Sequence, residues 1–152
     1  MTLDLIVDED VAIAAALRTQ LRREVARMVK AAALTDQRAD YEVALRLCAD
    51  PAIHELNRAW RHKDKPTDVL AFAQREAARA DSALLGDIVI SVETAKRQAR
   101  RGLHKELLHL ASHGLCHLLG YDHRDDAEEA TMNARAAALL AEALRAGPIR
   151  AA

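Results

Sequence analysis

Apolar residues alternate with polar ones, or run together briefly, in four short stretches of the chain. Residues 3–7 form an apolar run that is interrupted by Asp4, and residues 41–47 alternate between apolar and polar positions. Residues 69–73 and 84–90 are short and mostly apolar, as in strands that are buried in a sheet. Both patterns are typical of β-strands. We therefore expect four strands.

Apolar residues recur at helical spacing, or boundary residues mark a helix, in the first half of the chain. Residues 11–33 predict an amphipathic helix whose basic side chains form a solvated face. Asp50 reads as an N-cap with Pro51 at the first helical position, which predicts a helix that reaches Trp60. A polar loop is expected over 61–67.

Three further helices are expected after the last strand. Ser91 marks the start of the first, and Gly102 separates it from a longer helix over 103–119. Gly120 ends that helix, as glycine commonly does just past a C-terminus. Asp125 or Asp126 caps an alanine-rich helix that runs to about residue 146. Residues 74–82 show no periodicity and are expected to form an exposed connection.

Strands and helices mix along the chain without strict alternation. This order predicts an α+β fold, in which about five helices pack on a small, mostly four-stranded sheet. A length of 152 residues fits one domain that covers residues 1–152. Half of the residues are apolar but only 3% are aromatic, so we expect an aliphatic core that is rich in helices.

Composition narrows the range of partners and compartments. The formal net charge of −1 argues against a protein that coats nucleic acid without specificity, although a local basic groove remains compatible with it. Two cysteines cannot form a disulfide framework, the first ten residues are acidic where a signal peptide is basic, and no stretch is long enough to span a bilayer. We therefore expect a cytoplasmic protein without a membrane partner.

Three histidines have the spacing of a metal site. His113 and His117 are four residues apart on the predicted helix, so both rings project from one face. Gly120 ends the helix, and the chain can then return His123 to the same point. Three imidazoles leave the fourth position of zinc open for water, which is typical of catalytic rather than structural zinc. We expect a hydrolytic zinc site.

Neighbouring residues leave alternatives open. His109 lies one turn before His113 and, as a fourth ligand, would close the site; we expect it to be a packed or supporting histidine instead. Cys116 is the only nearby thiol. In the zinc peptidase motif H-E-x-x-H a glutamate base follows the first histidine, whereas here that position is Gly114. A peptidase would need a carboxylate from elsewhere.

Three blocks of sequence resemble one known family. The segment His113-Gly-x-x-His117-Leu-x-Gly-Tyr-Asp-His123 is similar to the signature of the YbeY endoribonucleases, also called rRNA maturation factors. The block 56–72, which contains Leu-Asn, Trp-Arg and Lys-Asp-Lys-Pro-Thr-Asp-Val-Leu-Ala-Phe, and the block 85–90, Leu-Gly-Asp-Ile-Val-Ile, resemble the family in the same order. The resemblance covers most of residues 56–126.

The resemblance implies a metal-dependent hydrolase fold, with one Zn²⁺ per chain held by His113, His117 and His123. It also implies single-strand-specific endoribonuclease activity in rRNA maturation, at the 3′ end of 16S rRNA, and in ribosome quality control. The implied partners are single-stranded RNA, as precursor rRNA, and the ribosome or components of its small subunit. The family's catalytic arginine corresponds to Arg61, which can clamp phosphate oxygens in a fork.

Some positions depart from the family pattern, and others have two interpretations. Trp60 occupies a position where the family usually has tyrosine. The other departures are Ala71 in place of serine, Ala73 in place of proline and Cys116 in place of leucine. Asp122 is either a support for a ligand imidazole or a turn residue. The cations around 58–65 and 96–105 either flank the metal cleft, as a groove for RNA, or are ordinary solvated faces.

The other functions compatible with the histidines are a zinc peptidase and a non-catalytic ribosome assembly factor. The peptidase would need a glutamate near the metal. The assembly factor would hold a structural zinc with four protein ligands, the fourth being His109 or Cys116.

Overall fold

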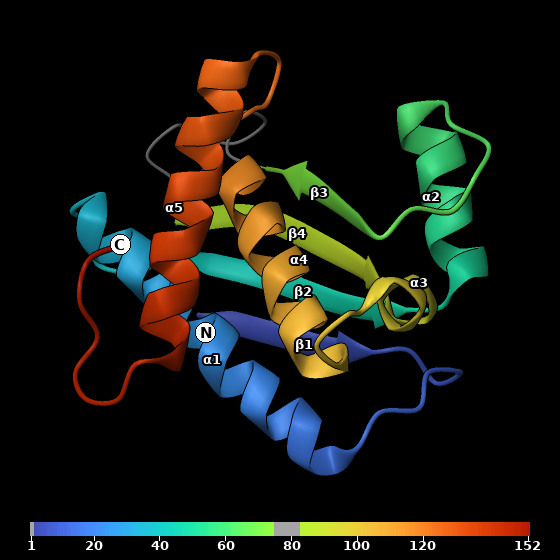
Figure 1. Cartoon of the computed structure of the whole chain (residues 1–152), viewed down its shortest axis with the longest axis horizontal. Helices are drawn as coiled ribbons and strands as arrows, with labels where there is room; N and C mark the ends of the chain where they lie inside the picture. Colours follow the sequence, from blue (N-terminus) through green and yellow to red (C-terminus); the bar gives the residue numbers. More distant parts are fainter. Residues whose placement is uncertain (1, 75–82) are drawn as a thin grey trace.

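A four-stranded sheet forms the centre of the protein (Figure 1). The computed structural model describes residues 2–74 and 83–152. The strand order is β1-β2-β4-β3, in which β1, β2 and β4 run parallel and β3 pairs antiparallel with β4. The strands are β1 (Leu3–Val7), β2 (Glu42–Cys48), β3 (Val69–Ala73) and β4 (Leu84–Ser91).

Five helices lie around this sheet in the described part of the chain. They are α1 (Ala15–Thr35), α2 (Asp50–Arg61), α3 (Val92–Gln98), α4 (Leu103–Leu118) and α5 (Asp126–Leu144). In Figure 1, α1, α4 and α5 lie together over one face of the sheet, while α2 lies apart from them. The α+β class, the four strands and the five helices are therefore as predicted. That residues 1–152 form one domain stays a prediction.

The two faces of the sheet bury separate apolar clusters. Ile88 and Ile90 of β4 belong to the large cluster that α1, α4 and α5 complete. Val89, which lies between them in the strand, belongs instead to a small cluster with Cys48, Leu70 and Ile53 of α2. Alternate residues of a strand point to opposite faces, so one strand supplies both clusters. Burial of each large aliphatic side chain stabilises the fold by roughly 1.5–3 kcal/mol.

Helix α4 lies unusually close to the sheet at Gly114. A Cβ atom added to Gly114 would lie 2.7 Å from Cγ2 of Ile88 in β4, which is shorter than a van der Waals contact. The buried leucines 107, 108, 110, 115 and 118 pack α4 against the same core. His109, His113 and His117 lie on a more exposed side of α4, and His117, only three residues after Gly114, faces residues of β3.

Two helix boundaries differ from those that the sequence predicts. Helix α1 begins at Ala15 rather than at residue 11, because Val11 and Ile13 precede the helix and pack against the core from the preceding segment. Helix α5 ends at Leu144 rather than near residue 146.

Asp50 is not an N-cap. Ala49 occupies that position, and Asp50 is already in α2. Its carboxylate accepts hydrogen bonds from the hydroxyl groups of Ser91 (2.5 Å) and Thr94 (2.7 Å) and from Arg97 (2.7 Å). These contacts tie α2 to α3 and hold the pKa of Asp50 below its ordinary value, although burial alone would raise it. Helix α3 does begin as predicted, since Ser91 accepts from Thr94 N.

The expected connection over 74–82 lies, apart from Gln74, outside the described residues. Gln74 itself donates from its side chain to Asp87 of β4 (2.8 Å). Among the described helices, none is long and apolar enough to cross a membrane.

Candidate functional site

The turn that follows α4 brings two of the predicted ligands together. Gly120 has φ +101°, a conformation that glycine adopts readily, and its N–H donates to the carbonyl of His117 (3.1 Å). Tyr121 N donates to the carbonyl of Cys116 (3.1 Å), which completes the reversal of the chain. As a result the rings of His117 and His123 lie 5.4 Å apart between centroids, at 78° to one another.

A backbone carbonyl fixes which nitrogen of the His117 imidazole carries the proton. Nδ1 of His117 lies 3.1 Å from the carbonyl of Tyr121, and Nδ1 of His113 lies 3.0 Å from the carbonyl of His109. A carbonyl only accepts, so Nδ1 of His117 donates and its Nε2 keeps its lone pair, whereas Nε2 of His113 faces a second acceptor, Oδ1 of Asn133. Burial lowers the pKa of His117, which favours the neutral ring that a metal requires. This arrangement suits ligation through Nε2.

His113 is turned toward α5 instead of toward the other two histidines. Its Nε2 lies 3.3 Å from the side-chain amide of Asn133 in α5. Over residues 2–74 and 83–152 no three His, Cys, Asp or Glu side chains are grouped closely enough to hold a metal ion. The donor types fit zinc, but His113 would have to rotate away from Asn133 to join His117 and His123. Ligation by all three therefore stays a prediction.

Arg61 shares a pocket with His117 and His123. The pocket has a volume of about 370 Å³. Its other lining residues come from the end of α2, the following loop and β3: Asn57, Lys63, Lys65, Thr67, Val69, Leu70 and Ala71. Residues that are more than fifty positions apart in sequence thus meet in one pocket, as the sequence blocks predicted.

The guanidinium of Arg61 is held from one side only. One terminal nitrogen donates to the carbonyl of Ala71 (2.7 Å), and the guanidinium carbon lies 4.8 Å from the centre of the Phe72 ring. Its remaining N–H groups have no partner among the described residues. Since arginine presents five donors in a rigid fork, the free edge can bind two oxygens of a phosphate.

The loop after Arg61 is shaped by two further residues. His62 adopts φ +58° and ends α2, and Lys63 N donates to the carbonyl of Asn57. The buried side chain of Asn57 donates in turn to the carbonyl of Lys65 (2.9 Å). Sequence reasoning gave Asn57 no role. Its membership of the Leu-Asn block was the available signal, but the bracing of the loop depends on contacts that the sequence does not show.

The pocket is cationic. Arg61, Lys63 and Lys65 line it, and no carboxylate is found among the lining residues that the structure describes. Of the cations near 58–65, Arg61, Lys63 and Lys65 therefore flank the histidines, whereas Arg100, Arg101 and Lys105 of the group near 96–105 line a different pocket. An anionic ligand such as a phosphodiester suits this lining.

The residues that had two interpretations are now placed. Cys116 is fully buried, its thiol faces the carbonyl of Met132, and burial raises the pKa of the thiol to about 11. His109 stacks at a tilt against His113, with 4.3 Å between centroids, and does not line the pocket of His117. Asp122 accepts from the backbone N of His123 (2.8 Å), as a turn residue does.

Two of the remaining histidines contact carboxylates away from this pocket. His104 contacts the buried carboxylate of Glu24 (2.9 Å), and His54 contacts Asp64 (2.7 Å). Both imidazoles are therefore engaged outside the candidate site.

An α+β fold with a cationic, imidazole-lined pocket defines a protein suited to a phosphate-bearing substrate. The model of the family described as Endoribonuclease YbeY matches residues 7–144, so the chain belongs to this family. Among its relatives, the Endoribonuclease YbeY of Synechococcus sp. is 53% identical over 107 residues, which cover 66% of this chain and 67% of that protein. The Endoribonuclease YbeY of Desulfitobacterium hafniense is 43% identical over 126 residues, covering 76% and 80%.

A solved structure shows a similar fold. The solution structure of TM1509 from Thermotoga maritima superposes with a TM-score of 0.61 at 27% sequence identity, and the match covers 93% of this chain and 88% of that one. Together with the relatives' names, this similarity supports a nuclease of the hydrolase class.

Proposed function

We propose that this protein is a zinc-dependent endoribonuclease that cleaves single-stranded RNA. The observation that supports this most directly is the pocket in which Arg61, Lys63 and Lys65 lie with His117 and His123, without a carboxylate among its described lining residues. By analogy with the family, its substrate is precursor rRNA at the 3′ end of 16S rRNA, its partners are the ribosome or small-subunit components, and its setting is cytoplasmic.

The histidines would hold the metal. His117 and His123 already lie together, and rotation of His113 away from Asn133 would supply the third Nε2. Zinc bound there supplies a Lewis acid for the phosphoryl group and activates water as the nucleophile. The carbonyl of Tyr121 keeps the imidazole of His117 in the tautomer that can bind through Nε2.

Arg61 would act on the phosphate itself. Its hydrogen bond to Ala71 and its contact with Phe72 fix the guanidinium, so that its free donors can meet the charge that develops on the phosphoryl oxygens. Lys63 and Lys65 are placed to bind neighbouring phosphates as flexible point charges.

Neither alternative function gains support from the site. A zinc peptidase would use a carboxylate as its base, and the described lining of the pocket contains none. A structural zinc would need a fourth protein ligand, and Cys116 is unsuited because its buried thiol faces the carbonyl of Met132.

The test compares zinc-loaded wild type with His117→Ala. We expect wild type to cleave single-stranded RNA and to lose this activity on chelation, and the variant to lose both bound zinc, measured by elemental analysis, and cleavage. His54→Ala is the matched control, because it removes an imidazole that pairs with Asp64 outside the pocket. Circular dichroism verifies that both variants fold. Equal cleavage by wild type and His117→Ala would indicate a contaminating nuclease and contradict the proposal.

A further inference from the structure

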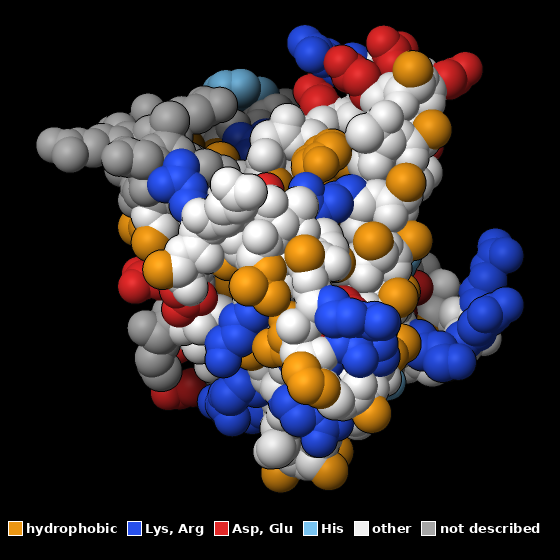
Figure 2. Space-filling view, turned by 90° about the vertical axis from the view of Figure 1, so that its left-hand side faces the viewer, with side chains coloured by type: hydrophobic (Ala, Val, Ile, Leu, Met, Phe, Trp, Pro, Cys, Tyr) orange, Lys and Arg blue, Asp and Glu red, His pale blue; other side chains and the backbone are white. Residues whose placement is uncertain are grey.

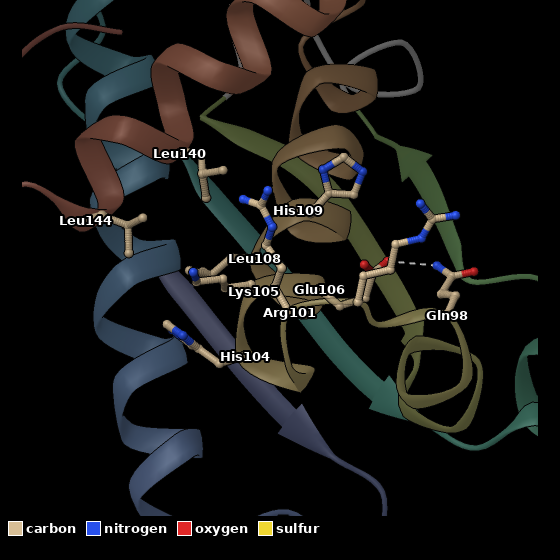
Figure 3. A pocket seen from close by; sticks show the side chains of 10 residues that line it. Gln98, Arg101, His104, Lys105, Glu106, Leu108, His109, Leu140 and Leu144 are labelled. Carbon is tan, nitrogen blue, oxygen red and sulfur yellow. Dashed lines mark hydrogen bonds between the residues drawn. The ribbon is translucent and has the colours of Figure 1, made fainter.

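A second and larger pocket lies between the N-terminal half of α4 and the C-terminal half of α5 (Figure 3). Its volume is about 540 Å³. In Figure 3, Leu140 and Leu144 approach it from α5, while Arg101, Lys105 and His109 approach it from α4 and the segment before it. The pocket of Arg61, His117 and His123 shares no lining residue with it.

The cations of this second pocket are free to bind an anion. Arg100, Arg101 and Lys105 are exposed, and none forms an ion pair or a side-chain hydrogen bond with the residues that the structure describes. The acidic residue of the described lining, Glu106, accepts a hydrogen bond from Gln98 (2.8 Å). The net charge of the chain is close to zero, but Lys and Arg side chains gather in groups on the face shown in Figure 2. The pocket therefore carries an excess of positive charge.

The remaining wall of the pocket is apolar. Leu108 is buried, Leu140 is half-buried, and Leu144 of α5 is 57% exposed. The faces of unpaired bases are apolar surfaces that a single strand exposes and a duplex hides. A wall of leucines beside free cations thus matches a single-stranded nucleic acid, whose phosphates alternate with such surfaces.

The second pocket adjoins the candidate metal centre along α4. His109 lines this pocket, and its ring lies 4.3 Å from the ring of the predicted ligand His113. Lys105 and His113 are about 12 Å apart along the helix axis, from the helical rise per residue. That distance corresponds to a few nucleotides of an extended strand. One RNA strand can therefore occupy the catalytic pocket and this pocket at the same time.

We propose that the second pocket is an RNA-binding subsite that holds the substrate strand a few nucleotides from the bond that is cut. Arg101 and Lys105 bind its phosphates, with Arg100 beside them, and Leu140 and Leu144 contact its base faces. This inference rests on the proposed endoribonuclease function and assigns no catalytic residue. It predicts that this pocket raises the affinity for longer RNA strands and leaves the chemistry of cleavage unchanged.

The test uses two fluorescein-labelled oligouridylates, of about 12 and about 2 nucleotides, the second being too short to span both pockets. The variant carries Arg101→Glu with Lys105→Glu. We expect its affinity for the longer RNA, measured by fluorescence anisotropy, to fall at least about tenfold, with little change for the shorter one. The slope of log affinity against log salt should flatten by about 1.4, because each lost phosphate contact contributes about 0.7 on single strands.

The matched control carries Arg18→Glu with Arg22→Glu, which makes the same charge change on the exposed face of α1. It should bind both RNAs nearly as wild type does. Unchanged binding of the longer RNA by the Arg101/Lys105 variant, or an equal loss for both lengths or in both variants, would overturn the subsite. Failure of wild type to cleave either RNA would instead contradict the proposed function, so the two failures are distinguishable.

Discussion

The two faces of α4 have different tasks. One face carries Gly114 and five leucines, all of which are buried against the sheet and the neighbouring helices. The other carries His109, His113 and His117, none of which is fully buried. The first face decides whether the helix packs, and the second decides what the packed helix presents to a ligand.

This difference means that stability and chemistry can be changed separately. Removal of a contact on the buried face leaves a cavity or creates a clash, and both cost folding free energy. Removal of an outward imidazole leaves the core intact, so its loss should appear in metal binding and cleavage rather than in folding. Each of the following changes tests that separation.

Gly114→Glu should have the largest effect. It introduces the glutamate of the zinc peptidase motif, but even a Cβ atom would meet Ile88 at 2.7 Å, and the carboxylate would be buried without a partner. We expect the variant not to fold, as judged by circular dichroism and by the absence of a cooperative thermal transition. Gly114→Ala should fold but lose about 1–3 kcal/mol in urea unfolding.

His109→Glu is the matched control on the exposed face of the same helix. It should keep a cooperative transition close to that of wild type. If Gly114→Glu were also to unfold at the wild-type temperature, the close packing of α4 on β4 would not be what excludes a side chain at this position.

Arg61→Ala should reduce activity strongly and stability weakly. The guanidinium is exposed, so loss of its hydrogen bond to Ala71 should cost about 0.5–1.5 kcal/mol. Loss of a donor aimed at the phosphoryl oxygens should lower kcat/KM for single-stranded RNA about 10²–10³-fold. Arg61→Lys keeps the charge without the fork and should recover only part of this.

Arg58→Ala is the control for Arg61, because Arg58 lies on the same helix and pairs with Glu55. Its kcat/KM should stay close to wild type. An equal loss of activity in Arg58→Ala and Arg61→Ala would show that general positive charge on α2, and not the placement of Arg61, supports cleavage.

The sequence predicted the elements that local patterns define. Three local signals were used: the period of two in β2, the helical period in α4 and the glycine at position 120. Each depends only on neighbouring residues, and each prediction was confirmed to within one or two positions. The meeting of Arg61 with His117 and His123 followed from the family resemblance, because spacing alone says nothing about residues so far apart.

Long-range contacts account for what the sequence did not predict. Asp50 is a residue type that is common at N-caps, but its carboxylate accepts hydrogen bonds from Ser91 of β4 and Arg97 of α3. The sequence showed only that Gly114 replaces the glutamate base of the peptidase motif. Its proximity to Ile88 explains why this position has no side chain. The contact of His113 with Asn133 depends on how α5 crosses α4, which no local pattern records.

Glu142→Gln should have the smallest effect on activity and should change stability alone. The buried carboxylate of Glu142 in α5 accepts from Arg145 and from the backbone N of Arg150, both at 2.7 Å. These donors, Arg145 first, lower the pKa of Glu142 from 4.5 to about 2. The folded state thus binds this proton less readily than the unfolded state, so the stabilisation is complete above about pH 4.5 and is lost as the pH falls to about 2.

The melting-temperature difference between wild type and Glu142→Gln should therefore be largest at neutral pH and disappear toward pH 2. Glu129→Gln, at an exposed carboxylate of the same helix, should show no such dependence. RNA cleavage at neutral pH and moderate temperature should be unchanged in both variants, because Glu142 lines neither cationic pocket. A difference that stays constant with pH would mean that the carboxylate charge does not stabilise the fold, whereas altered cleavage would mean that stability and chemistry are coupled through α5.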